Sequence, residues 1–444
     1  MPPSNLSLKT LHTSPYGWPL RQLRIPQAHE TTRGRSDVIV AVIDLGYRPH
    51  PHHRGHLWVN PNPSRGDRHG WDCHDDDASL EYNLHNPDSD YNKGHHAFVV
   101  GEVIACAPGC RVMVVRVGYG NPDSWWKGID YAVEHGARIL VMPHGFISHG
   151  PRSPIPLFYR GTDFSYPVDN PQIRRALDDA YDAGCLIFKG TADNRGRRVA
   201  TISPGLDTVV AVGSSNRGGQ AADICCSADY VEVAAPGGER GSGRLMDQVW
   251  CTGGDRNYIP FTGGCMASGF AGGVAALAMS RFPDLSNSQI RQILRNTARG
   301  EGWDPELGWG ILDAHRAVSV KSTALCQRLK IRPSACVFAQ RKRKPVVRIA
   351  LRNQGVFDVD RALVAAFNGN PLAAAAPEGT LERSVTLVTR QIGHAIGSVR
   401  GLDDTVVEVE LTEKPAGPIW IQACTLDRHG SDDVRTIRLD GPTR

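Results

Sequence analysis

Short runs of apolar and β-branched residues alternate with helical patterns from Asp37 to about Val318, and this alternation is the strongest constraint on the fold. Strands that are apolar along their whole length belong to parallel sheets, because such strands are buried on both faces. The gaps between the runs hold helical patterns such as IRRALDDAYDAG, as crossovers between parallel strands require, and SNSQIRQILRNTA carries a capping-box signature. We therefore predict an α/β domain at residues 1–320, with a parallel sheet covered by helices on both faces. The predicted strands are 38–44, 111–117, 138–142, 185–188, 208–213 and 230–236.

The chain changes character after about Lys321. Alternating apolar and polar residues, divided by Gly, Pro and Asp turns, replace the helical patterns. Because the 444 residues are about three times the ~150 of an average domain, a second unit is expected. We predict an antiparallel β-sandwich at residues 321–444. Its basic run Arg341–Lys344 fits a phosphate-binding patch or, as we favour, a solvated edge that blocks strand pairing.

Composition excludes several classes of protein. The 50 Lys and Arg residues nearly balance the 46 Asp and Glu residues, and the net charge of +4 argues against a dedicated binder of nucleic acid or of an anionic membrane. No run of about 18 apolar residues occurs, so no membrane-spanning helix is expected. The N-terminus lacks the apolar stretch of a secretory signal, and the 11 cysteines lack the spacing of a disulfide scaffold. We therefore expect a cytoplasmic protein.

Three segments hold residues suited to catalysis. Asp44 ends an apolar strand, at the edge where α/β sheets place their sites, although Asp is also common there as a turn or cap residue. His95 follows Gly94 and begins a helical pattern, a position that suits a general base or a helix cap. Cys265 follows two glycines at the start of a helix, where the helix dipole favours the thiolate. Each residue taken alone has a structural explanation as well.

Together, these segments resemble the subtilisin-like protease family in motif, order and spacing. The strand-Asp-x-Gly motif of that family matches Val40–Gly46, and its Gly-His-Gly-Thr-His-Val-Ala-Gly helix matches Gly94–Gly101. Its Gly-Thr-Ser-Met-Ala-Thr-Pro segment matches Gly263–Gly269, with Cys265 in the place of the nucleophilic serine. The order Asp, His, nucleophile is that of subtilisin. The similarity extends over about residues 16–318 and implies a subtilisin-like fold for this part of the chain.

The resemblance implies a role for each matched residue. Asp44 would orient His95, and His95 would take the proton of Cys265 and return it to the leaving group. Asn194, together with the amide of Cys265, would donate hydrogen bonds to the oxyanion. Two edge strands would hold an extended peptide by β-augmentation. The residues of these strands are Gly118, Tyr119, Gly120, Met142, Pro143, His144 and Gly145.

The chain departs from the family pattern at several positions near the site. Gly264 stands for Thr, Gly269 stands for Pro, and residues 96–98 differ from Gly-Thr-His. Lys189 lies in a stretch that is small and apolar in the family, and it has no assigned role. Cys265 has three interpretations: a natural thiol nucleophile, an engineered substitution, or a relic of lost activity. Because the departures from the family pattern occur at several positions, and a single engineered substitution would change only one, they favour a natural thiol nucleophile.

We therefore expect a subtilisin-like endopeptidase or peptidyl transferase that forms an acyl-enzyme on Cys265. Its substrate would be a peptide or protein, cleaved during the maturation of one specific chain. Transfer competes with hydrolysis, because amines attack thioesters relatively well. The alternative is an inactive pseudoprotease whose cleft binds an extended peptide, with the β-sandwich as an interaction module for a partner protein.

No cofactor and no metal site is expected. The His-rich residues 49–56 coincide with a family helix segment, and HDDD at 74–77 offers oxygen ligands for calcium. However, the long calcium loop of many subtilisins is missing before residue 111. Cys106 and Cys110 are close enough in sequence to pair or to bind a metal, although no second pair lies nearby. Cys225 and Cys226 are expected to be small buried hydrophobes.

Overall fold

The computed structural model divides the chain into two compact units, Met1–Ser319 and Val320–Arg444. None of the helices in the described ranges is both long enough and apolar enough to cross a membrane. The structure describes residues 13–81, 94–118, 121–143, 164–165, 170–191, 199–200, 208–228, 230–253, 258–342, 344–368, 391–412, 414–415, 418–425 and 435–439.

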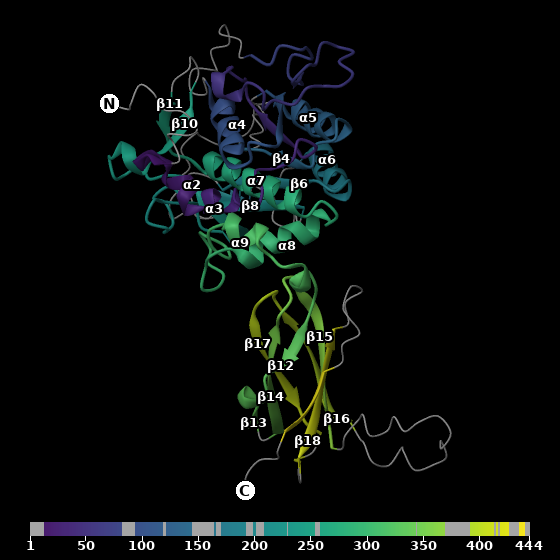
Figure 1. The fold of residues 1–444 in the computed structure, drawn as a ribbon. Coiled ribbons are helices and arrows are strands. Elements are labelled where there is room, and N and C mark those ends of the chain that lie inside the picture. The colour runs from purple at the N-terminus through teal and green to yellow at the C-terminus, as the bar shows by residue number, and fades with distance from the viewer. Residues whose placement is uncertain are drawn as a thin grey trace. The chain divides into compact units, whose positions relative to one another are not determined.

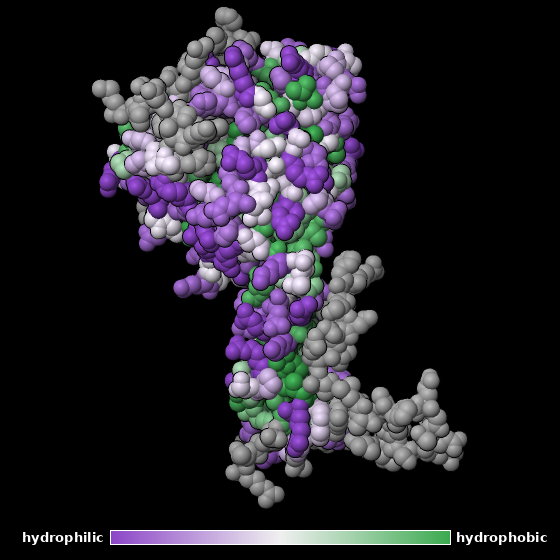
Figure 2. Space-filling view, in the orientation of Figure 1, coloured by the Kyte–Doolittle hydropathy of each residue, from purple (hydrophilic) through white to green (hydrophobic). Residues whose placement is uncertain are grey.

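A seven-stranded parallel sheet forms the centre of the larger unit (Figure 1). Its strands pair in the order β2-β3-β1-β4-β6-β8-β9, so β1 lies between β3 and β4. Strands β8 and β9 are buried along their whole length, whereas hydrophilic residues predominate on the visible face of this unit in Figure 2. The parallel sheet predicted from the apolar runs is confirmed. The strands are β1 (Ile39–Asp44), β2 (Gly70–Asp72), β3 (Arg111–Arg116), β4 (Ile139–Val141), β6 (Leu186–Gly190), β8 (Val209–Ser215) and β9 (Val231–Pro236).

Helices cover both faces of this sheet, also as predicted. On one face, Ala41 and Ile43 of β1 share a buried cluster with Ile129 of α5 and Leu177 of α6. The alternate residues of β1 face the other side, where α4 and α7 pack. The predicted capping box of α8 is present, with Ser286 and Gln289 each bonded to the backbone of the other. The helices are α2 (Trp18–Gln22), α3 (Ile25–Ala28), α4 (His95–Cys106), α5 (Pro122–Glu134), α6 (Pro171–Asp182), α7 (Gly264–Arg281), α8 (Asn287–Thr297) and α9 (Ala314–Val318).

Glycines allow α7 to approach the sheet and α4 closely. A Cβ atom at Gly272 would lie 2.3 Å from Cγ2 of Val141 in β4. A Cβ atom at Gly273 would lie 2.5 Å from the Cβ atom of Cys106 in α4. Side-chain carbons do not approach one another that closely, so both positions require glycine in this packing. The glycine-rich sequence of α7 therefore sets how near it lies to α4.

The smaller unit is an antiparallel β-sandwich, as predicted. One sheet has the order β12-β14-β13 with β17 also paired to β14, and the other has the order β16-β15-β18-β19. Buried residues of both sheets, including Val347, Val364 and Ile421, form one apolar cluster. The strands are β12 (Leu329–Ile331), β13 (Val337–Arg341), β14 (Lys344–Asn353), β15 (Val359–Phe367), β16 (Gln391–Val399), β17 (Asp404–Glu410), β18 (Ile419–Thr425) and β19 (Arg435–Leu439).

The basic run of this unit pairs with acidic residues on a neighbouring strand. Arg341 lies 3.2 Å from the carboxylate of Glu408 in β17, and Lys344 forms an ion pair with Glu410. The side chains of Arg341 and Lys344 are largely exposed, so each pair contributes little to stability. These exposed ion pairs agree with the solvated run that we favoured over a phosphate-binding patch. The expectation that the run blocks strand pairing is wrong, because Arg341 of β13 pairs with Lys344 of β14.

Gly273→Ala tests the packing of α7 against α4. We expect the free energy of unfolding to fall by about 1–3 kcal/mol, because the added methyl group meets Cys106. This loss outweighs the gain of up to about 1 kcal/mol in helix propensity. Urea denaturation measures it, and Gly218→Ala at an exposed turn is the control. A Gly273→Ala protein as stable as the control would show that the two helices can separate without cost.

Candidate active site

Asp44 and His95 form a buried hydrogen-bonded pair at the carboxyl edge of the sheet. Asp44 is the last residue of β1, and His95 is the first residue of α4. The Nδ1 atom of His95 donates to Oδ2 of Asp44 at 2.7 Å, and the backbone amide of Leu45 donates to Oδ1 at 2.7 Å. Gly94 precedes the helix with a φ of 96°, a left-handed conformation that favours glycine. The pair therefore holds the imidazole ring in one orientation.

Cys265 is the second residue of α7, at the same edge of the sheet. A Cβ atom at Gly190, the last residue of β6, would lie 2.2 Å from the carbonyl oxygen of Gly264 and 3.2 Å from the amide nitrogen of Cys265. The glycine at position 190 thus lets the first turn of α7 rest directly on the end of β6. Cys265 is half-buried, whereas the other described cysteines of the larger unit are buried. Cys265 is therefore the most exposed cysteine residue of that unit among the described residues.

The structure brings Asp44, His95 and Cys265 together. Burial by itself would lower the pKa of His95, but the charge of Asp44, the charge of Cys265 and the hydrogen bonds of both side chains to the ring raise it. The net effect is a pKa of His95 well above its usual value. The raised pKa favours the imidazolium form of His95 beside Asp44 and Cys265.

Glu102 is a buried acid on α4 that the sequence analysis did not single out. Burial raises the pKa of Glu102 well above its usual range, although a hydrogen bond from Cys251 and the charge of His95 act in the opposite direction. The thiol of Cys251 donates to Oε1 of Glu102 at 3.5 Å. A Cβ atom at Gly269 would lie only 2.3 Å from Oε2 of Glu102. A side chain at position 269, where the family has proline, would therefore meet the carboxyl group of Glu102.

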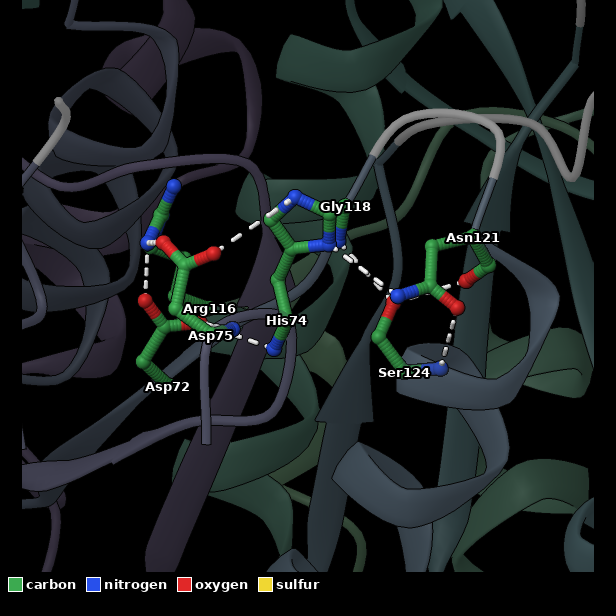
Figure 3. Close-up of polar contacts among 7 residues, drawn as sticks. All are labelled: Asp72, His74, Asp75, Arg116, Gly118, Asn121 and Ser124. Atoms are coloured by element: carbon green, nitrogen blue, oxygen red, sulfur yellow. Dashed lines mark hydrogen bonds and ion pairs between the residues drawn. The ribbon is translucent and has the colours of Figure 1, made fainter. Parts of the chain in front are cut away.

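Gly118, a predicted substrate-binding residue, lies against the side chain of His74. A Cβ atom at Gly118 would lie 2.0 Å from Nδ1 of His74, and the amide of Gly118 donates to Oγ of Ser124 at 2.9 Å. The side-chain amide of Asn121 lies 3.1 Å from Nδ1 of His74. Figure 3 shows this arrangement and the neighbouring ion pairs of Arg116. The position of Gly118, the first residue of the predicted peptide-binding strand, is therefore fixed by its contact with His74 and by its hydrogen bond to Ser124.

Acidic residues before this strand bind Arg116 at the end of β3. Arg116 forms ion pairs with Asp72 and, at 2.6 Å, with Asp75, which belongs to the HDDD segment considered as a calcium ligand. A histidine of the His-rich segment also has protein partners. The ring of His53 forms hydrogen bonds with the hydroxyl of Tyr47 at 2.7 Å and with the hydroxyl of Thr252 at 3.0 Å. Within the described ranges, no three His, Cys, Asp or Glu side chains are placed to hold a metal ion.

The remaining predicted site residues have different outcomes. The amide of Met142 donates to the carbonyl of Phe188 at 2.9 Å, so it extends the pairing of β4 with β6. Pro143 follows it and is also described and buried. Cys106, Cys110, Cys225 and Cys226 are all buried, which agrees with the expectation that the last two are small buried hydrophobes. Five predicted residues lie outside the described part of the chain: Tyr119, Gly120, His144, Gly145 and Asn194.

Comparison with known proteins identifies the family of the larger unit. The model of the peptidase S8 group, described as the subtilase family, matches residues 35–310. The chain belongs to the subtilase family. The resemblance inferred from the three motifs is thereby confirmed at the level of the family.

The relatives of this subtilase include bacterial proteases. A thermostable alkaline protease from Halalkalibacterium halodurans is 27% identical over 307 residues, which are 68% of this chain and 73% of the relative. Fervidolysin from Fervidobacterium pennivorans is 25% identical over 337 residues and 68% of this chain, which spans only 43% of fervidolysin. Among solved structures, a lanthipeptide protease matches with a TM-score of 0.56 and 22% identity over 70% of this chain and 97% of that protein. The structural match shows the subtilisin-like fold.

Glu102→Gln tests the buried acid through the pH dependence of stability. An unfolded Glu loses its proton near pH 4.3, whereas folded Glu102 keeps it to a much higher pH. Over that interval the folded state binds the extra proton, so the free energy of unfolding falls as pH rises, by about 1.4 kcal/mol per pH unit. Glutamine cannot ionise, so we expect the variant to lose less stability between about pH 5 and about pH 8. Thermal unfolding midpoints measure this, with Glu134→Gln on the exposed side of α5 as control. Parallel pH profiles for both variants and the parent would contradict a protonated Glu102.

Proposed function

We propose that this subtilase is a cysteine-nucleophile peptidase or peptidyl transferase that forms an acyl-enzyme on Cys265. The observation that carries the proposal is the buried hydrogen bond of 2.7 Å between Asp44 and His95, whose ring also interacts with Cys265, because Asp44 stabilises the imidazolium that forms when the ring takes the thiol proton. We place the activity in the cytoplasm, and ten cysteines of the described chain that form no disulfide bond support a reducing environment.

In the proposed acylation step, His95 accepts the proton of Cys265 and the sulfur attacks the scissile carbonyl carbon. Asp44 stabilises the imidazolium through the hydrogen bond to Nδ1. The backbone amide of Cys265, at the start of α7, donates to the developing oxyanion, and Asn194 is proposed as the second donor. The carbon–nitrogen bond then breaks, the amine leaves with the proton from His95, and a thioester remains on Cys265.

In the second step a nucleophile attacks the thioester, and His95 takes its proton. Water gives a carboxylic acid, whereas an amine gives a new amide, and in both cases Cys265 leaves and recovers its proton. Because amines attack thioesters relatively well, we propose that transfer competes with hydrolysis. The proposed substrate is an extended segment of one specific peptide or protein, bound beside Gly118.

A second candidate function is the binding of an extended peptide without cleavage. The observation in its favour is the set of departures at the start of α7, where Cys265 and Gly269 replace family residues and Glu102 fills the freed space. In this case the β-sandwich would serve as an interaction module for a partner protein. The two functions differ in one respect that can be measured, since only the peptidase forms a covalent acyl-thioester.

Substitution of Cys265 tests the proposed nucleophile. We expect Cys265→Ala to lower the turnover of a cleavable peptide from a labelled library by at least about a thousandfold, because no other group replaces the sulfur. Cys265→Ser should keep part of the activity through the same His95, and Cys336→Ala in the smaller unit should keep all of it. Mass spectrometry of the quenched reaction should detect the acyl group on the peptide that contains Cys265.

Full turnover by Cys265→Ala would overturn the covalent mechanism. Tight peptide binding by the parent protein with neither turnover nor an acyl adduct would favour the non-catalytic function instead.

A further inference from the structure

Three histidines near the candidate active site pack against one another, and the proposed mechanism does not use them. His52 and His53 belong to the short helix η2 (Pro51–His53), and Nδ1 of His50 caps this helix by accepting from the backbone amide of His52 at 3.2 Å. The ring centroid of His50 lies 5.0 Å from that of His52 and 5.3 Å from that of His53. His50 and His53 are almost completely buried. Rings that can each take a proton are therefore held together largely out of water.

This cluster is bonded to a small antiparallel sheet of two strands, β10 (Val249–Thr252) and β11 (Tyr258–Phe261). These strands lie outside the seven-stranded sheet (Figure 1). Nδ1 of His52 forms a hydrogen bond with the hydroxyl of Tyr258 in β11. Nε2 of His53 lies 3.0 Å from the hydroxyl of Thr252 in β10. A two-stranded sheet is marginally stable by itself, so contacts such as these keep both strands in place.

The hydrogen bonds of His53 fit a neutral ring. The hydroxyl of Thr252 donates to the carbonyl oxygen of Ala97 in α4 at 2.6 Å, so it accepts from Nε2 of His53. A neutral imidazole has one N–H, so Nδ1 of His53 accepts from the hydroxyl of Tyr47 at 2.7 Å. A second proton on the ring would have to displace the proton that Tyr47 donates. The arrangement therefore disfavours the charged form of His53.

Burial and neighbouring charges oppose protonation as well. Burial lowers the pKa of His53 well below its usual value, and the largest charge effects on this ring come from other histidines. Burial also lowers the pKa of His52. Among the described residues, the titratable groups around the two rings are His50 and His56 of the same segment, Tyr47 with Glu81 beside it, His96 of α4 and Tyr258 of β11. The cluster is therefore stable in place only while its rings are neutral.

The two strands that the cluster holds also contact the candidate active site. Phe261, the last residue of β11, has its ring centroid 5.9 Å from that of His95 and 5.3 Å from that of Phe98. The chain then leads through Gly263 into α7, whose second residue is Cys265. Displacement of β10 and β11 would remove Phe261 from the ring of His95 and pull on the segment that precedes Cys265.

We propose that His52 and His53 are positioning residues whose hydrogen bonds hold β10 and β11 against α4, and that acid releases these strands by protonating the two rings. The catalytic consequence rests on the proposed function, because the released strands would carry Phe261 away from His95. Below about pH 6.5, the usual pKa of histidine, the open form binds protons that the closed form excludes. The closed form therefore loses stability as pH falls, and each such proton raises the opening constant about tenfold per pH unit.

Glu102 acts in the opposite direction. Burial raises the pKa of Glu102 well above its usual range, so its carboxyl group keeps a proton in the closed form. The thiol of Cys251 in β10 donates to this carboxyl group, so opening would expose it to water and release the proton. Two protons gained by His52 and His53 and one lost by Glu102 leave one net proton. We therefore expect the opening constant to rise about tenfold from about pH 6.5 to about pH 5.5.

Labelling of Cys251 by a pyridyl disulfide, a reagent that also reacts with thiols in acid, measures this opening without a substrate. Cys251 is buried in the closed form. Mass spectrometry gives its labelling rate in the folded protein, divided by its rate in the urea-unfolded chain at the same pH. In the parent this ratio should rise about tenfold from about pH 6.5 to about pH 5.5. In His53→Gln it should stay within about twofold, because the amide can bond Thr252 and Tyr47 but takes no proton.

Controls separate release of the strands from general unfolding. Cys185 is buried elsewhere in the larger unit, where its thiol donates to the carbonyl of Ala137 at 3.1 Å, and its labelling ratio should not change over this pH range. His315→Gln removes a histidine of α9 outside the cluster and should keep the rise of the parent. His52→Gln alters the half-buried member of the cluster and provides a second variant that should reduce the rise.

Turnover of a cleavable library peptide adds a catalytic readout. The kcat of the parent should fall reversibly at the pH at which the open form predominates, and His53→Gln should retain its kcat to a lower pH.

A parent ratio for Cys251 that does not rise in acid would overturn the proposal, as would an equal rise in the parent and both glutamine variants of the cluster. A parallel rise for Cys185 would also overturn it, because the whole unit would then be unfolding. Failure of the proposed function appears elsewhere, as full turnover by Cys265→Ala, and it leaves the labelling of Cys251 unaffected. The two failures are therefore distinguishable.

Discussion

The hydrogen bond between Asp44 and His95 is the interaction on which the rest of the site depends. The carboxylate of Asp44 is completely buried, and a buried charge is tolerated only when it is paired. His95 provides that pairing because α4 begins where β1 ends. The first turn of α4 is thereby tied to the edge of the sheet, and α7 packs beside it on the same face.

Small side chains allow the second helix to reach this edge. Gly190 accommodates the start of α7, and Gly273 accommodates its close approach to α4. The same packing places the carboxyl group of Glu102 beside Gly269, which is one of the departures from the family pattern. Ionisable side chains are concentrated in this region: Asp44, His95, Glu102 and Lys189 are all buried. The surroundings of Cys265 therefore differ from those of a family serine in electrostatics as well as in shape.

Much of the fold was predictable because its elements have strong local patterns. The apolar run that became β1 and the capping box of α8 are examples, since both depend on residues close in sequence. The start of α5 was less predictable: the structure begins it at Pro122, because Asn121 caps it by accepting from the amide of Ser124. Contacts between residues that are distant in sequence produce no local sequence pattern from which they could be predicted. The sequence offered one indication of Glu102, because it is the single acidic residue in the otherwise apolar helix sequence 97–106. It offered no indication of the ion pair between Arg116 and Asp75.

The sequence by itself determined that the chain forms a parallel sheet with helices, that a β-sandwich follows, and that Asp, His and Cys occur in the subtilisin order. These features depend on periodicity and on short motifs, which are local properties. Only the tertiary structure decided that Asp44 and His95 meet at 2.7 Å, that the carboxyl group of Glu102 lies beside Gly269, and that Lys189 is buried. These depend on how β1, β6, α4 and α7 pack, because burial and distance between remote residues set their charges.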